Sequence, residues 1–203
     1  MALTKIKNAI KVKGDNSKEH LGLVHVITGD GKGKTTSSLG LALRAVGNNL
    51  QVCMIQFLKS GFTGEIYSAK KLGFEIEQFG VDALKDKQKN LKEFSDKTGS
   101  FTFQPDIKEK DAAMQGWEHC KKTIKNGEYD MVIMDEINCV LEKNLIPINE
   151  VIEILKNHGK VELILTGRDA PQEIIELADY VNVVQSVKHP WQKGIIARKG
   201  IEY

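Results

Sequence analysis

The stretch TGDGKGKTT at residues 28–36 constrains the fold more than any other part of the sequence. It follows a short apolar run, LVHVIT at 23–28, and precedes a segment in which Leu39, Leu43 and Val46 recur at helical spacing. This pattern predicts a strand, a glycine-rich turn and a helix. Glycines at three alternate positions let the backbone fold into a concave nest of N–H groups, and the helix amino terminus adds partial positive charge. Such a turn is suited to binding phosphate groups.

The spacing is close to the phosphate-binding P-loop pattern GxxxxGK[ST], with Thr28 where the first glycine is expected. Lys34 supplies a mobile charge, and the Thr35 hydroxyl is a candidate Mg²⁺ ligand. Lys32 and Lys34 would repel each other across a tight turn if no anion lay between them. This favours a phosphate site over a glycine-rich turn that binds nothing. The residues expected to contact the nucleotide from this loop are Gly29, Asp30, Gly31, Lys32, Gly33, Lys34, Thr35 and Thr36.

Strand-like and helix-like segments alternate along the rest of the chain. Apolar, strand-like runs occupy 51–57, 74–79, 131–136, 162–167 and 180–184, and helical patterns occupy 64–73, 111–127, 148–158 and 170–178. Such alternation implies βαβ units. We therefore expect an α/β fold of the P-loop NTPase type, with a mostly parallel central sheet and helices on both faces.

Two segments do not follow this alternation of strands and helices. Residues 1–20 carry five lysines, with Leu3, Ile6 and Ile10 at helical spacing, and are either a frayed terminus or a short docking helix. Residues 81–100 are highly charged with few apolar anchors, and we expect an exposed excursion there rather than a domain boundary. The remainder, 21–203, is expected to form one domain.

Composition excludes several classes of protein. The 203 residues carry 29 Lys plus Arg against 27 Asp plus Glu, a formal net charge of +2, so charge gives no indication of nucleic-acid binding. Three cysteines without a CxxC pair argue against a disulfide framework or a zinc site, and Cys53 and Cys139 are expected to be buried hydrophobes. No apolar stretch is long enough for a membrane span, and no secretory signal is recognisable. We expect a cytoplasmic enzyme.

Polar residues follow several of the predicted strands, where ligands of parallel sheets bind. Asp135 and Glu136 end one strand, and because side chains alternate along a strand, only one of them is expected to address Mg²⁺ directly. Arg168 follows another strand and either reaches phosphate or ribose oxygens or pairs with the adjacent aspartate. Gln56 and Lys59 lie at the end of another predicted strand, and the same two roles are open for them: contact with the nucleotide or pairing within the protein. His25 lies within a strand and is expected to be a satisfied core residue, and no HExxH, GxSxG or GxGxxG motif is present.

Together, several motifs resemble the P-loop family of ATP:corrinoid adenosyltransferases. The resemblance runs in order from about residue 22 to residue 203, and the threonine at position 28 and the carboxyl-terminal motif make it more specific than a P-loop alone. The motifs that carry it are TGDGKGKTTSSLGLALRAVG, QFLKS, MDEIN, LTGRDAPQEIIELADYV and VKHPWQKGIIARKGIEY.

The resemblance implies an activity and a set of partners. The 5′-deoxyadenosyl group of ATP would pass to the cobalt of a reduced corrinoid with release of tripolyphosphate, with Mg²⁺ held by Thr35 and Glu136. The nucleotide would lie reversed in its loop, so that C5′ rather than the γ-phosphorus is exposed. The family pattern further implies a homodimer, an amino-terminal segment that covers the corrinoid site, and a reduced flavoprotein as electron donor.

Two departures from the family pattern concern the corrinoid side. An aromatic FTW-type segment of the family displaces the lower ligand of cobalt, and here GSFTFQP supplies Phe101 and Phe103, the second in place of tryptophan. The alternative is that both rings are ordinary apolar anchors of a loop. The charged stretch 81–98 looks like an insertion before this segment. The competing functions are a phosphoryl-transfer enzyme (an ATPase or kinase) and a non-catalytic nucleotide-dependent corrinoid-binding protein.

Overall fold

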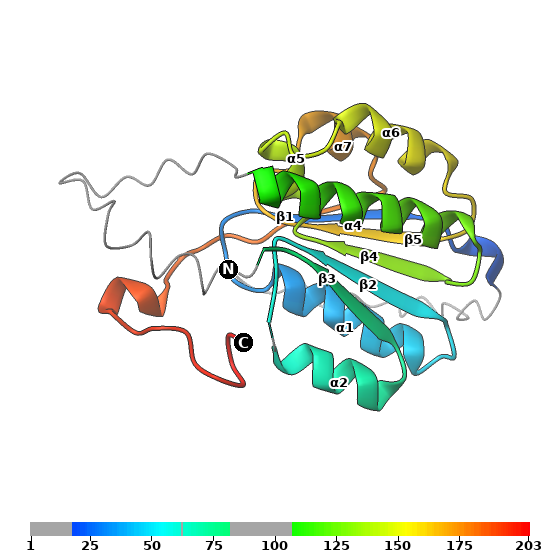
Figure 1. The fold of residues 1–203 in the computed structure, drawn as a ribbon. Helices are drawn as coiled ribbons and strands as arrows, with labels where there is room; N and C mark the ends of the chain where they lie inside the picture. Colours follow the sequence, from blue (N-terminus) through cyan, green and yellow to red (C-terminus); the bar gives the residue numbers. More distant parts are fainter. Residues whose placement is uncertain (1–17, 62, 82–106) are drawn as a thin grey trace, which may run out of the picture.

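Six parallel strands form one sheet in the computed structural model, which describes residues 18–61, 63–81 and 107–203 (Figure 1). The strands are β1 Val24–Thr28, β2 Val52–Phe57, β3 Glu75–Phe79, β4 Met131–Asp135, β5 Glu162–Thr166 and β6 Tyr180–Val183. Their order across the sheet is β3-β2-β4-β5-β1-β6, and every neighbouring pair is parallel. The predicted α/β fold with a parallel sheet is confirmed.

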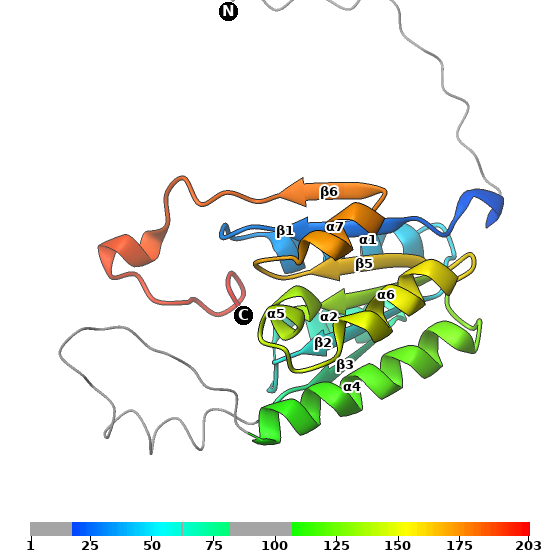
Figure 2. The same cartoon turned by 90° about the horizontal axis from the view of Figure 1, so that it is seen from above.

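Helices cover both faces of this sheet (Figure 1), and Figure 2 shows the molecule from above, with one of these faces towards the viewer. The helices on one face are α1 Lys34–Val46 and α2 Gly64–Leu72, and those on the other are α4 Ile107–Lys125, α5 Ile137–Glu142, α6 Ile148–Asn157 and α7 Gln172–Leu177. Short 3₁₀ turns occupy Lys18–His20 and Pro190–Lys193. Within the described residues, no helix has both the length and the apolar character needed to cross a bilayer.

The pleat of the central strands divides the core into two parts. Along β4, Ile133 packs towards α1 and α2, whereas its neighbour Met134 packs towards α4 and α5, and both are fully buried. Strands that are covered on both faces read as continuous apolar runs, which is why these segments were recognisable in the sequence. Trp117 of α4 is the largest fully buried side chain.

Most element boundaries lie within two residues of the sequence-based expectation, and the larger differences concern α5, α4 and β6. Helix α5 was not predicted, because its six residues are too few to display a helical period. Helix α4 begins at Ile107, four residues before the expected start at position 111. Strand β6 was expected as an apolar run, but it lies at the sheet edge and all four of its residues are exposed.

His25 has its polar partner, as predicted, but it is half-buried rather than a core residue. Its Nε2 lies 2.6 Å from Glu162 Oε1, and its ring stacks on Tyr180 with the ring centroids 4.5 Å apart. The proposed amino-terminal helix, most of the 81–100 excursion, and the aromatic pair Phe101 and Phe103 lie outside the described residues.

Candidate nucleotide site

The glycine-rich turn after β1 is packed against the segment that follows β6. Gly29 has φ +100°, and a Cβ there would lie 2.4 Å from the carbonyl oxygen of Val184. A Cβ on Gly31 would lie 2.7 Å from the backbone of Gln185, and the Gly31 N–H donates to Val184 O at 2.8 Å. Gly33 has φ +125° but open space around it. Two of the three glycines therefore have a packing reason in addition to the phosphate-binding reason inferred from the sequence.

Thr28 and Asp30 fix this turn to neighbouring strand ends. The Thr28 hydroxyl accepts a hydrogen bond from Ala170 N at 3.2 Å, and Asp30 Oδ1 accepts one from Ser186 N at 3.1 Å. Thr28 is buried. The threonine that departs from the general P-loop pattern thus ties the end of β1 to the loop after β5, which a glycine could not do.

The two lysines of the turn do not face each other. Lys34 Nζ turns into the loop and donates to Gly29 O at 2.7 Å and to Gly31 O at 2.8 Å. Burial lowers the Lys34 pKa, an effect that Glu136 opposes. Lys32 turns away towards the carboxyl-terminal segment, where Nζ donates to Ile201 O at 3.3 Å. The argument from mutual lysine repulsion was therefore wrong, because loop carbonyls hold the Lys34 ammonium group.

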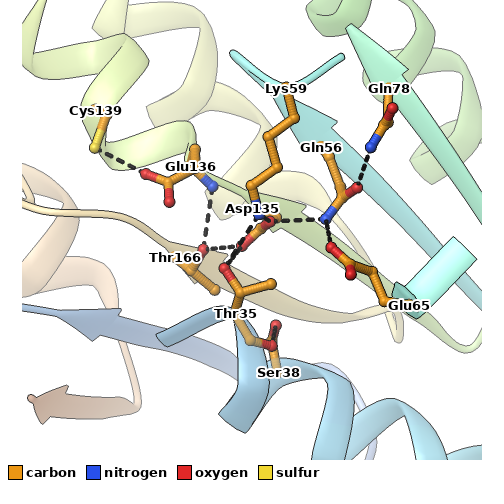
Figure 3. A network of polar contacts seen from close by, with 10 residues as sticks. All are labelled: Thr35, Ser38, Gln56, Lys59, Glu65, Gln78, Asp135, Glu136, Cys139 and Thr166. Carbon is orange, nitrogen blue, oxygen red and sulfur yellow. Dashed lines mark hydrogen bonds and ion pairs between the residues drawn. The ribbon is translucent and has the colours of Figure 1, made fainter. Parts of the chain in front are cut away.

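Asp135, at the end of β4, is the centre of a polar network (Figure 3), and its direct partners come from α1, β2, β5 and the segment after β2. Its side chain is fully buried. Its oxygens accept from Thr35 Oγ1 at 2.9 Å, Thr166 Oγ1 at 2.6 Å, Gln56 Nε2 at 3.1 Å and Lys59 Nζ at 2.5 Å. A carboxylate with this many donors is held in one position and in turn fixes the orientation of the Thr35 hydroxyl.

Glu136 does not continue the pleat of β4. Its backbone is left-handed, with φ +66°, and it precedes the first turn of α5. Its N–H donates to Thr166 Oγ1 at 3.1 Å, and its Oε2 accepts from Cys139 Sγ at 3.0 Å. The expectation that strand alternation separates Asp135 from Glu136 therefore does not apply, because the strand ends between them. The hydroxyl of Thr35 contacts Asp135 rather than Glu136.

Cys139 connects two of these strand ends. Its sulfur donates to Glu136 and accepts from the Arg168 N–H at 3.2 Å. Burial and the neighbouring carboxylate of Glu136 raise the Cys139 pKa to about 12. The side chain is only half-buried and has polar partners, so the interpretation of Cys139 as a buried hydrophobe was wrong, whereas Cys53 is buried as expected.

The structure resolves some of the ambiguous polar residues. Arg168 is exposed and near enough to Lys34 to lower its pKa, and within the described chain it makes no ion pair with Asp169. Gln56 and Lys59 both contact Asp135. The sequence reasoning missed Thr166, although a polar residue closing the apolar run of β5 at the same sheet edge was an available signal.

The donor set determines what this site can hold. The Thr35 hydroxyl and the two adjacent carboxylates are hard oxygen ligands of the kind that Mg²⁺ prefers. The turn offers backbone N–H groups and the Lys34 ammonium group at the start of α1, where Thr36 is also exposed. These residues fit a triphosphate with its metal ion.

Comparison with family models and curated relatives shows the family to which the chain belongs. The model of the family described as "ATP:corrinoid adenosyltransferase BtuR/CobO/CobP" matches residues 20–203. The chain is 34% identical to the corrinoid adenosyltransferase CobA of Salmonella typhimurium, over 98% of this chain and 94% of that protein. It is 33% identical to a corrinoid adenosyltransferase of Sinorhizobium sp., over 90% of this chain and 80% of that protein. Among solved structures, the cytoplasmic domain of EssC aligns with a TM-score of 0.45 and 14% identity, over 88% of this chain and 35% of that one.

Proposed function

The chain belongs to the ATP:corrinoid adenosyltransferase family, and from this premise we propose that it transfers the 5′-deoxyadenosyl group of ATP to the Co(I) of a reduced corrinoid. Tripolyphosphate is the other product. The observation that carries the proposal is the family match over residues 20–203. A phosphate-binding turn with its lysine at the start of α1 supports it, because the reaction requires a held triphosphate.

The chemistry needs charge stabilisation and orientation rather than proton transfer. The electron pair of Co(I) forms a bond to C5′ of ATP while the bond from C5′ to the triphosphate oxygen breaks. The leaving triphosphate takes the electron pair of the broken C5′–O bond. Co(I) carries no proton that a base must remove. A site of N–H donors, ammonium groups and hydroxyls suits this step, because such groups stabilise charge on the leaving triphosphate. Holding the reactants in line is worth about 7–11 kcal/mol in favourable cases.

Residues of the turn would bind the triphosphate. We propose phosphate contacts from the backbone of the turn and from Lys32 and Lys34, with Arg168 at the neighbouring strand end. Lys34 exchanges its hydrogen bonds to loop carbonyls for phosphate oxygens, and Lys32 leaves its contact with Ile201. The family resemblance further supports a reversed nucleotide, with C5′ directed towards the corrinoid.

We propose that Thr35 and Glu136 would hold Mg²⁺. Asp135 would not bind the metal directly but would hold the Thr35 hydroxyl in position, because its buried oxygens already accept hydrogen bonds from the protein. When bound, the metal ion supplies positive charge to the leaving triphosphate. The family resemblance also supports a homodimer, a reduced flavoprotein as electron donor, a cytoplasmic location, and a role for Phe101 and Phe103 in displacing the lower ligand of cobalt. These remain predictions.

Replacing Glu136 by glutamine should raise the Mg²⁺ concentration needed for half-maximal adenosylation roughly tenfold or more. Asp135→Asn should change this concentration much less, but should lower the melting temperature more, because it removes an acceptor from a buried network. Activity measured against Mg²⁺ concentration and thermal melting separate the two effects. The reverse ranking of metal dependence would show that Asp135 is the metal ligand.

Product analysis tests the proposed activity directly. Incubation of the protein with Mg·ATP and chemically reduced cobalamin should yield tripolyphosphate and a light-sensitive cobalt–carbon bond, in equal amounts. ADP and orthophosphate as the only products would indicate a phosphoryl-transfer enzyme instead. Binding of both substrates without turnover would indicate a non-catalytic corrinoid-binding protein.

A further inference from the structure

Lys59, which follows β2, places its ammonium group in the middle of the network in Figure 3. Nζ lies 2.5 Å from Asp135 Oδ2 and 3.3 Å from Thr35 Oγ1. The Lys59 side chain is 26% exposed, whereas the side chain of Asp135 is fully buried. A carboxylate buried in this way needs a cation beside it, because an uncompensated buried charge is strongly unfavourable. In the described part of the chain, Lys59 is the cation that forms an ion pair with Asp135.

The backbone around Lys59 is held in an unusual conformation that aims the side chain at this site. Leu58 has φ +55°, which is rare for a branched residue, and its N–H donates to Phe79 O at 2.9 Å. Gly80 packs on the Lys59 main chain so closely that a Cβ would lie 2.5 Å from the Lys59 nitrogen. Strain of this kind persists where the surrounding structure enforces it, and it is concentrated at functional sites.

The Thr35 hydroxyl has two partners in this network. Its hydrogen is donated to Asp135 Oδ1 at 2.9 Å, and its oxygen accepts from Lys59. A metal ion bound to Thr35 also requires a lone pair of that oxygen. A divalent cation there would lie close to the Lys59 ammonium group and repel it at short range. Lys59 and the metal ion are therefore competitors.

We propose that, before nucleotide binds, Lys59 lies against Thr35 and Asp135 and so excludes a divalent cation from Thr35, and that it moves to the triphosphate when Mg·ATP binds. The inference deepens the proposed function and relies on it only for the location of the nucleotide site. Before nucleotide binds, Lys59 neutralises the charge of Asp135, so the affinity of the site for a free divalent ion is low. The arriving nucleotide offers ligands to the metal and a new anionic partner to the lysine. Metal and nucleotide binding are thereby coupled.

Binding of Mn²⁺ without nucleotide tests the first half of this proposal. The free ion is measured by its electron paramagnetic resonance signal during titration of the wild type and of Lys59→Met. The variant should bind Mn²⁺ about tenfold more tightly, because Asp135 has lost its cation. Lys71→Met, which removes an exposed charge from α2, is the matched control and should behave as the wild type. The double variant Lys59→Met with Asp135→Asn should lose the gain, which would attribute it to the uncompensated charge of Asp135 beside the proposed metal ligands Thr35 and Glu136.

A second variant covers the case in which Lys59→Met does not fold. Lys59→Gln keeps N–H donors for Asp135 but removes the charge, and it should show the same gain in Mn²⁺ affinity. Its melting temperature in EDTA should lie below that of the wild type and rise when Mn²⁺ is added. Mn²⁺ affinity equal to that of the wild type in this variant overturns the proposal that Lys59 excludes a divalent cation from Thr35.

The second half is tested with inorganic tripolyphosphate in EDTA, by calorimetry. The wild type should bind this anion about tenfold more tightly than Lys59→Gln, whereas Lys71→Met should match the wild type. Equal affinities in the wild type and Lys59→Gln overturn the movement of the lysine to phosphate. Neither titration uses a corrinoid or turnover of ATP, so both results are independent of the outcome of the adenosylation assay.

Discussion

Replacing Lys34 by alanine is expected to lower the affinity for Mg·ATP by roughly two orders of magnitude or more. The physical reason is the loss of two or more charge-assisted hydrogen bonds to phosphate, each worth about 1.5–3 kcal/mol. Calorimetric titration with Mg·ATP measures the effect, with Lys71→Ala as the control for loss of a positive charge elsewhere. Unchanged affinity would contradict the assignment of the turn after β1 as the nucleotide site.

The same variant should not unfold the protein. Within the described residues, the buried Lys34 ammonium group is held by two carbonyl oxygens, and burial lowers its pKa. Removing a buried charge relieves a desolvation penalty, and alanine is a favourable residue in the first turn of a helix. The melting temperature of Lys34→Ala should therefore stay at the wild-type value or rise. A large decrease would mean that the lysine is chiefly structural.

Gly29→Ala is expected to destabilise the fold by about 3 kcal/mol or more, from left-handed backbone strain and overpacking together. A Cβ on Gly29 would meet the carbonyl oxygen of Val184 at 2.4 Å, and because its three nearest atoms are all Val184 backbone, there is little room for relaxation. Gly33→Ala is a matched control, because φ at Gly33 is also positive but no atom lies within 4 Å of the added Cβ.

Urea unfolding of the two glycine variants separates strain from packing. Gly33→Ala should lose only about 1–2 kcal/mol of unfolding free energy, the cost of the backbone conformation alone. The difference between the variants then measures the contact between the turn and the segment after β6. If both variants lose the same free energy, the close approach of Val184 does not constrain the turn.

Local patterns in the sequence were sufficient for the architecture of the fold. The strand, turn and helix around residues 28–36 followed from glycine spacing and hydrophobic period, and the alternation of strands with helices predicted a parallel sheet, which is confirmed. Both are properties of short windows, in which each residue type favours one local conformation. For the same reason the positions of Lys34 and Thr35 at the end of the glycine-rich turn could be predicted from the spacing of the motif.

The tertiary structure alone decided which strand ends meet and what their side chains contact. Gly29 needs to be glycine because Val184, far along the chain, packs against it. Asp135 became the centre of the site because β2, β4 and β5 are neighbours in the sheet, which brings Lys59 to it. Strand order and the left-handed turns at Leu58 and Glu136 are set by packing between distant segments. A periodic pattern within one segment contains no information about such contacts, so the sequence determined the elements and the folded chain determined their partners.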